Sequence, residues 1–221
     1  MPSVMHGKKA VYADPNGRPP MLAPNFVTIP EGLAGIARWL CWKLVWKADQ
    51  SPKNGTAPGR WTKQPKRIDG RAGSSTDSAT WSTFAEVRDA YATERFDGVG
   101  FTLGDGLAGI DLDDCRNPDT GIVEPWAVDI VVRFRSYTEI SPSGTGLKIF
   151  CLGTWAGDWH RRQHGSGEVE VYDCGRYFAV TGREFPDHRY RVTDAQEALD
   201  ELAALKTDDS KRTPADSANG P

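Results

Sequence analysis

The segment that most constrains this chain is GIDLDD, residues 109–114, where an apolar run ends in three aspartates within four positions. Side chains alternate between the two faces of a strand, so Asp111 and Asp113 are expected on one face and the apolar residues between them on the other. Carboxylates held side by side repel each other unless a cation lies between them. The segment therefore predicts a strand with a core face and an acidic face, with Asp114 outside the acidic site.

The acidic pair suggests a divalent metal ion. Carboxylate oxygens are the ligands that Mg²⁺ and Mn²⁺ prefer, and a D-x-D pair at a strand end suits one or two such ions. The D-x-D spacing is common, however, and the competing interpretation of DLDDCRNPDTG is a polar loop with Asx-type turns. This segment alone leaves both interpretations open.

A second acidic segment, EVEV, occupies residues 168–171. Strand alternation places Glu168 and Glu170 on a polar face and the two valines on an apolar face. Glu170 is the candidate for a third metal-binding carboxylate, although alternation alone does not distinguish it from Glu168. The competing interpretation is a solvated sheet face.

The turn SPSGTG, residues 141–146, is a candidate phosphate-binding segment. Glycines and small residues let backbone N–H groups converge on an anion, and hydroxyls add further donors. Gly/Ser turns are also common without any ligand. The residues expected to contact a nucleotide here are Ser141, Ser143, Gly144, Thr145, Gly146 and the nearby Lys148. Together with the two acidic segments, this turn supplies what nucleotidyl transfer requires: metal-binding carboxylates and a phosphate site.

The remaining patterns predict an α+β fold, mostly antiparallel or mixed sheet with flanking helices. A long polar loop is expected over residues 51–81, a hairpin turn at residues 104–106, and a strand pair formed by EVEVYD and RYFAVTG. Helices are expected over residues 83–92, 124–134 and 193–205, the first and last beginning with T-x-x-E and T-x-x-Q caps. Strands are expected at residues 39–47, 99–103, 107–112, 136–141, 146–152, 168–173 and 176–182.

The chain is expected to have a flexible N-terminal arm over residues 1–26, one domain over 27–206, and a polar tail or linker over 207–221. It contains no apolar run long enough to span a bilayer and no secretory signal, and its four cysteines are scattered without zinc spacing. These features predict a reduced cytoplasmic protein without a membrane partner. A net charge of −3 argues against a simple nucleic-acid coat.

The segments FDGVGFTLGDGLAGIDLDDC, SYTEISPSGTGLKIF and VEVYDCGRYFAVTG resemble the primase–polymerase domain of the archaeo-eukaryotic primase superfamily, in its phage and plasmid form. The resemblance extends from about Pro30 to Gly182. It implies a two-metal site with Mg²⁺ or Mn²⁺. It also implies that Lys148 stands where the family usually has a histidine, and that Arg176 lies near the nucleotide. The catalytic residues implied are Asp111, Asp113, Lys148 and Glu170, with Asp111, Asp113 and Glu170 as metal ligands. The resemblance also implies that Glu168 contributes little.

Basic segments with nearby aromatic residues suggest contacts with nucleic acid. The expected nucleic-acid-binding residues are Lys63, Lys66, Arg161 and Arg162, with Trp61 and Trp159 available to stack on bases. The competing interpretation is that these are solvated loops.

The expected function is template-dependent DNA primase and polymerase activity in phage or plasmid replication. The expected partners are a single-stranded DNA template, dNTPs or NTPs, and a helicase beyond the C-terminal tail. The alternatives are a catalytically weak or inactive DNA-binding module for replication initiation, which Lys148 favours, and a two-metal nuclease.

Overall fold

The computed structural model describes residues 14–49, 59–186 and 191–204, and these form two antiparallel sheets with helices, which confirms the predicted α+β class. The four-stranded sheet has the order β2 (Gly59–Lys66), β1 (Trp39–Ala48), β3 (Gly98–Thr102) and β9 (Tyr177–Val180). The five-stranded sheet has the order β5 (Tyr137–Ile140), β6 (Leu147–Leu152), β4 (Leu107–Asp113), β8 (Gly167–Tyr172) and β7 (Arg161–His164).

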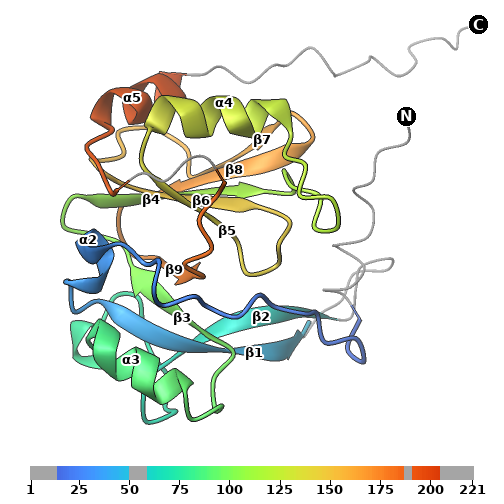
Figure 1. The fold of residues 1–221 in the computed structure, drawn as a ribbon, viewed down its shortest axis with the longest axis vertical. Helices are drawn as coiled ribbons and strands as arrows, with labels where there is room; N and C mark the ends of the chain where they lie inside the picture. The colour runs from blue at the N-terminus through green and yellow to red at the C-terminus, as the bar shows by residue number, and fades with distance from the viewer. Residues whose placement is uncertain (1–13, 50–58, 187–190, 205–221) are drawn as a thin grey trace, which may run out of the picture.

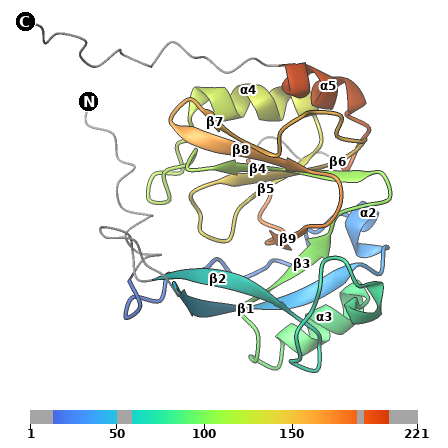
Figure 2. The same cartoon turned by 180° about the vertical axis from the view of Figure 1, so that it is seen from behind.

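The two sheets lie one above the other, with helices on their outer sides (Figures 1 and 2). Helices α4 (Pro125–Phe134) and α5 (Gln196–Ala204) cover the outer face of the five-stranded sheet, and α3 (Phe84–Tyr91) lies against the four-stranded sheet. A short helix, α2 (Glu31–Ala34), precedes β1. No helix in the described part of the chain is long and apolar enough to cross a bilayer.

The predicted alternation along the acidic strand is confirmed. Ile110 and Leu112 are fully buried and pack in one apolar cluster with Ile130, Val131 and other residues of α4 and α5. The polar residues of β4 therefore point away from these helices, toward the space between the two sheets.

Local capping explains the helix boundaries. Thr83 caps α3 in the predicted capping box with Glu86, and α4 begins at Pro125 after Glu124 and ends before Arg135, which has a left-handed φ of 46°. The predicted cap of the last helix is wrong. The Thr193 hydroxyl donates to a distant carbonyl, and it is Asp194 that accepts the first free N–H of α5.

One loop prediction and two strand-pairing predictions are wrong. Strand β2 lies within the expected polar loop and pairs with β1 from Cys41↔Lys66 to Ala48↔Gly59; it lacks apolar alternation because it is an edge strand. The expected hairpin at 104–106 has only an isolated Gly104↔Leu107 bridge, because β3 and β4 belong to different sheets. Segments EVEVYD and RYFAVTG likewise separate into β8 and β9 of different sheets. In both cases the glycine-containing turn carries the chain from one sheet to the other.

Of the expected N-terminal arm, the structure describes Asp14 onward. The Leu22 amide donates to the Pro142 carbonyl at 2.8 Å, and the Asn25 amide donates to the Thr181 carbonyl at 2.7 Å. The described part of this segment therefore runs along the turn before β6 and the end of β9.

Candidate functional site

A row of charged side chains crosses the whole five-stranded sheet. The register pairs each member with the next: Glu139 of β5 with Lys148 of β6, Lys148 with Asp111 of β4, Asp111 with Glu170 of β8, and Glu170 with Arg161 of β7. Directly opposed residues share one face of a sheet, so all five lie on the same face. We call these five residues the charged row.

The charged row faces the four-stranded sheet. The Lys148 ammonium lies 4.4 Å from the centroid of the Phe178 ring, which belongs to β9. On the other face of the same strands, Ile149, Val169 and Val171 are buried under α4 and α5. The sheet thus holds its charged side chains between the two sheets and its apolar side chains under the helices.

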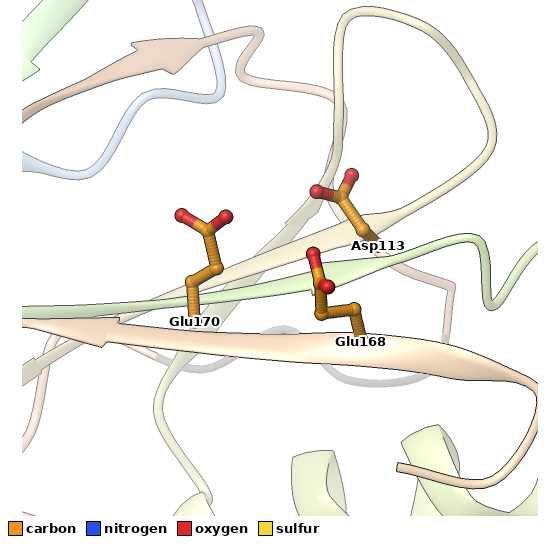
Figure 3. Close-up of side chains that lie close together, drawn as sticks. All are labelled: Asp113, Glu168 and Glu170. Carbon is orange, nitrogen blue, oxygen red and sulfur yellow. The ribbon is translucent and has the colours of Figure 1, made fainter. Parts of the chain in front are cut away.

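Glu170 of this row and two neighbouring carboxylates, Asp113 and Glu168, form what we call the acidic cluster. One oxygen from each lies within 4.8 Å of the others, and the three side chains rise from β4 and β8 to the same side (Figure 3). Asp113 and Glu168 are register partners, which brings Glu168 into the cluster although the sequence suggested a minor part for it. Burial, and then the charges of Asp111 and Asp113, raise the pKa of Glu170. The spacing is suitable for one divalent cation.

Asp111 lies beside the acidic cluster and is bound by Lys148. The lysine ammonium donates to Asp111 Oδ2, whereas Asp111 Oδ1 is buried without a hydrogen-bond partner in the described structure. Burial raises the pKa of Asp111, against the opposing effect of Lys148. A buried carboxylate oxygen without a donor is a suitable ligand for a cation.

These residues open onto a pocket of about 330 Å³. Its walls carry the cations Lys63, Lys148 and Arg161 and the carboxylates Asp111, Asp113, Asp114 and Glu168. Lys63 comes from β2, so the pocket draws side chains from both sheets. Asp114 lines the pocket although strand parity placed it outside; it follows the last residue of β4 and has a left-handed φ of 55°, where alternation no longer applies.

The Ser141–Gly146 turn forms one wall of the pocket through Ser141 and Ser143. Its side chains are linked to one another: the Ser143 hydroxyl lies 3.0 Å from that of Ser141 and 2.9 Å from that of Thr145. The Ser141 hydroxyl also accepts the Gly146 amide at 3.1 Å, and the Gly144 carbonyl accepts from Arg116. The turn is thus held in shape by its own hydroxyls, with two of them at the pocket.

Other candidate residues lie away from the pocket walls. The Arg176 guanidinium lies 4.7 Å from the centroid of the Tyr172 ring and donates to its hydroxyl at 3.3 Å. Lys66 is at the far end of β2, opposite Cys41. Arg162 pairs with Val169 on the opposite face of β7 from Arg161, and it lies 4.5 Å from the Trp159 ring centroid.

The two tryptophans proposed for base stacking already have protein partners. The Trp159 ring packs edge-on against Trp155, with centroids 5.0 Å apart, in addition to its contact with Arg162. The Trp61 indole donates to the Asp14 carbonyl and packs edge-on against Trp46.

Glu139 is a member of the charged row that the sequence analysis did not single out. It is fully buried and accepts hydrogen bonds from the Thr181 and Gly182 amides and from the Tyr137 hydroxyl. Burial raises its pKa to about 7. The sequence did offer a sign of its position: Glu139 is two residues after Tyr137 in a short apolar strand, so the two side chains are expected on the same face.

Comparison with known proteins gives one informative relationship. No family model matches the chain. The chain is 30% identical over 158 residues to the DNA primase-polymerase of Nitratiruptor phage NrS-1, a match that covers 69% of this chain and 20% of the phage protein. The chain therefore spans about a fifth of the length of this relative. Since the match includes most of the chain, it supports a relationship between this protein and primase-polymerases.

Proposed function

We propose that residues 27–206 form the catalytic domain of a DNA primase-polymerase, which joins nucleotides along a single-stranded DNA template. The observation that carries the proposal is the charged row. It places Asp111 of the D-x-D segment beside Lys148 of the S-x-S-G-x-G-x-K segment and beside Glu170 of the V-E-V segment, although the three segments are far apart in the sequence. Asp111, Asp113, Ser141, Ser143, Lys148 and Glu168 line the adjoining pocket, whereas Glu170 lies beside its walls. The similarity to the phage DNA primase-polymerase supports the same assignment.

The acidic cluster and Asp111 would hold Mg²⁺ or Mn²⁺. Crowded carboxylates and the unpartnered Asp111 Oδ1 fit such an ion. When bound, a divalent ion of this kind polarises phosphoryl oxygens and favours deprotonation of an attacking hydroxyl. The contribution of Asp113, Glu168 and Glu170 is to fix oxygens for this ion on rigid, paired strands, so that little reorganisation is needed.

The nucleotide's phosphates would lie against the cationic side of the pocket. Lys63, Lys148, Ser141 and Ser143 line the pocket together with Asp113 and Glu168, so positive charge and hydroxyl groups share it with the acidic cluster. Arg176 would lie farther out, beside the nucleotide. The proposed DNA contacts are Lys63, Lys66, Arg161 and Arg162. In this proposal the protein acts in phage or plasmid replication, with dNTPs or NTPs as substrates and a helicase beyond the tail.

One observation favours a second candidate function. The Lys148 ammonium neutralises Asp111, a carboxylate that catalysis would use. A domain in this state is consistent with a primase-like module that binds replication-origin or single-stranded DNA without synthesis.

Primer extension tests the proposal. The chain is incubated with a template, labelled dNTPs and either Mn²⁺ or Mg²⁺, with and without a primer, and Asp113→Asn serves as the matched control. Metal-dependent extension that Asp113→Asn abolishes supports the polymerase. Template binding without synthesis supports the binding module, and degradation of the template supports a nuclease.

A further inference from the structure

Two cations bind the carboxylates of the site, and their surroundings differ. Lys148, which binds Asp111, has a side chain only 7% exposed, and it is enclosed by the Phe178 ring. Arg161 binds Glu168 and Glu170, and its side chain is 64% exposed. A buried ammonium is fixed in place, whereas an exposed guanidinium is free to turn. Arg161 is therefore the cation that can leave the site.

The position of Arg161 also allows movement. It is the first residue of β7, an edge strand that pairs with β8 alone. Its register partner is Glu170, and its Nε lies 3.4 Å from Glu170 Oε1. Its guanidinium also reaches Glu168, which is two register pairs along the strand. One side chain thus spans two of the three carboxylates of the acidic cluster.

A divalent ion and the Arg161 guanidinium would compete for the same two carboxylates. Glu168 and Glu170 are two of the three possible ligands, and both already form ion pairs with Arg161. When a divalent ion takes these lone pairs, the guanidinium loses its partners and is repelled by the ion's charge. It already lines the pocket, on which Lys63 and Lys148 also converge. A guanidinium released there is well suited to bind phosphate oxygens in a two-point contact.

We infer that Arg161 acts as an exchangeable cation of the site: it covers Glu168 and Glu170 while no divalent ion is bound, and moves to the nucleotide phosphates when the ion binds. The inference rests on the proposed function for its metal and nucleotide, and it gives Arg161 a role distinct from contact with the template. This role implies an order of binding: the divalent ion binds first, because its binding makes Arg161 available to the nucleotide.

Direct Mn²⁺ binding, measured by calorimetry or by electron paramagnetic resonance of free Mn²⁺, tests the first half. Removal of the competing charge in Arg161→Gln should lower the Kd for Mn²⁺ by roughly three- to tenfold, the range for a largely exposed charge that makes two contacts. Arg133→Gln is the matched control, because it removes the same charge from a similarly exposed side chain on α4, outside the site. It should leave the Kd unchanged.

Binding of a fluorescently labelled dATP tests the second half. With saturating Mn²⁺, Arg161→Gln should weaken dATP binding by about tenfold, the loss expected for a charge-assisted contact to phosphate. Without a divalent ion the same substitution should have no effect. Arg161→Lys, which keeps the charge without the two-point geometry, should fall between wild type and Arg161→Gln in both assays.

Several results would overturn the inference. Mn²⁺ binding that is unchanged or weaker in Arg161→Gln, with an unaltered thermal midpoint, would mean that the arginine organises the carboxylates instead of competing for them. An equal loss of dATP affinity with and without Mn²⁺ would mean a permanent contact. Absence of Mn²⁺ binding in both proteins would also overturn it. Neither binding assay needs synthesis, so a wild-type protein that binds Mn²⁺ but extends no primer refutes only the proposed polymerase.

Discussion

Lys148 and Asp111 lie directly opposite each other on β6 and β4, 37 residues apart in the chain, and the lysine ammonium donates a hydrogen bond to the aspartate carboxylate. The Lys148 side chain is almost completely buried. The resemblance suggested that Lys148 contacts the phosphates of the nucleotide, whereas in the structure its ammonium is bound to Asp111, one of the proposed metal ligands. The two residues consequently depend on each other for stability.

Removal of Lys148 alone should destabilise the protein. Lys148→Ala leaves the Asp111 charge in a largely buried place without its partner, at a cost on the order of 3 kcal/mol in the free energy of unfolding, measured by urea denaturation. The double variant Lys148→Ala/Asp111→Ala should recover most of this loss, and Mn²⁺ should stabilise Lys148→Ala more than wild type. Equal destabilisation in the single and double variants would show that the ion pair does not matter.

Glu168 and Glu170 should both contribute to binding of a divalent ion. Each has an oxygen within 4.8 Å of the other cluster members, so Glu168→Gln and Glu170→Gln should each raise the Kd for Mn²⁺ by roughly ten- to a hundredfold. Calorimetry gives the Kd values for Mn²⁺. Exposed Glu197→Gln on α5 is the appropriate control. A Glu168→Gln protein that binds Mn²⁺ like wild type would restrict the site to the residues expected from the sequence.

Gly146→Ala should disturb both the Ser141–Gly146 turn and the end of β4. A Cβ at residue 146 would meet the Leu112 carbonyl oxygen at 2.5 Å and the Asp113 Cα at 3.5 Å. We expect a loss of about 1–3 kcal/mol in the free energy of unfolding and weaker Mn²⁺ binding, because the clashing Leu112 carbonyl belongs to the peptide bond that precedes Asp113 and must shift. Gly106→Ala has open space around its Cβ and a φ of 80°, so it should cost about 1 kcal/mol and leave Mn²⁺ binding unchanged. Loss of stability without loss of Mn²⁺ binding in Gly146→Ala would refute the coupling.

Glu139 should make stability decline as the pH rises through the slightly acidic range. Its pKa is raised by burial from 4.5 to about 7 in the folded protein, so between these values the folded state holds a proton that the unfolded state has lost. The contribution of Glu139 to the free energy of unfolding is therefore largest below pH 4.5, and it falls by roughly 3 kcal/mol by pH 7. Lys148, its neighbour in the charged row, opposes the shift. The free energy of unfolding of wild type minus that of Glu139→Gln, measured by denaturation from pH 4.5 to 7.5, should fall across this range; a constant difference would contradict the assignment.

Local patterns in the sequence were sufficient for most of the elements and for the orientation of their side chains, but not for the edge strands β2 and β7. The alternation around Asp111 and the valines beside Glu170 gave the acidic and apolar faces, and the capping box gave the start of α3. These features depend on residues a few positions apart, where strand and helix geometry fix the relationship.

Pairing between strands could not be predicted in the same way. Parity allowed Glu168 and Glu170 on one face, but only the β4–β8 register shows that Glu168 lies opposite Asp113. The glycine-containing turns after β3 and β8 are equally compatible with a hairpin and with a crossing to the other sheet, and tertiary packing decides between them. Lys63 was selected for its charge, whereas its place at the pocket results from β2, a strand without apolar periodicity.

The central position of β4 has a consequence for how the protein is made. Its two neighbours, β6 and β8, both follow it in the chain, and β8 ends at Tyr172. A ribosome that has released Asp111 and Asp113 has released neither Lys148 nor Glu170, so the nascent aspartates have no cation and no third carboxylate beside them. In the proposed function, the capacity to bind a divalent ion is therefore acquired only after β8 has emerged and paired with β4.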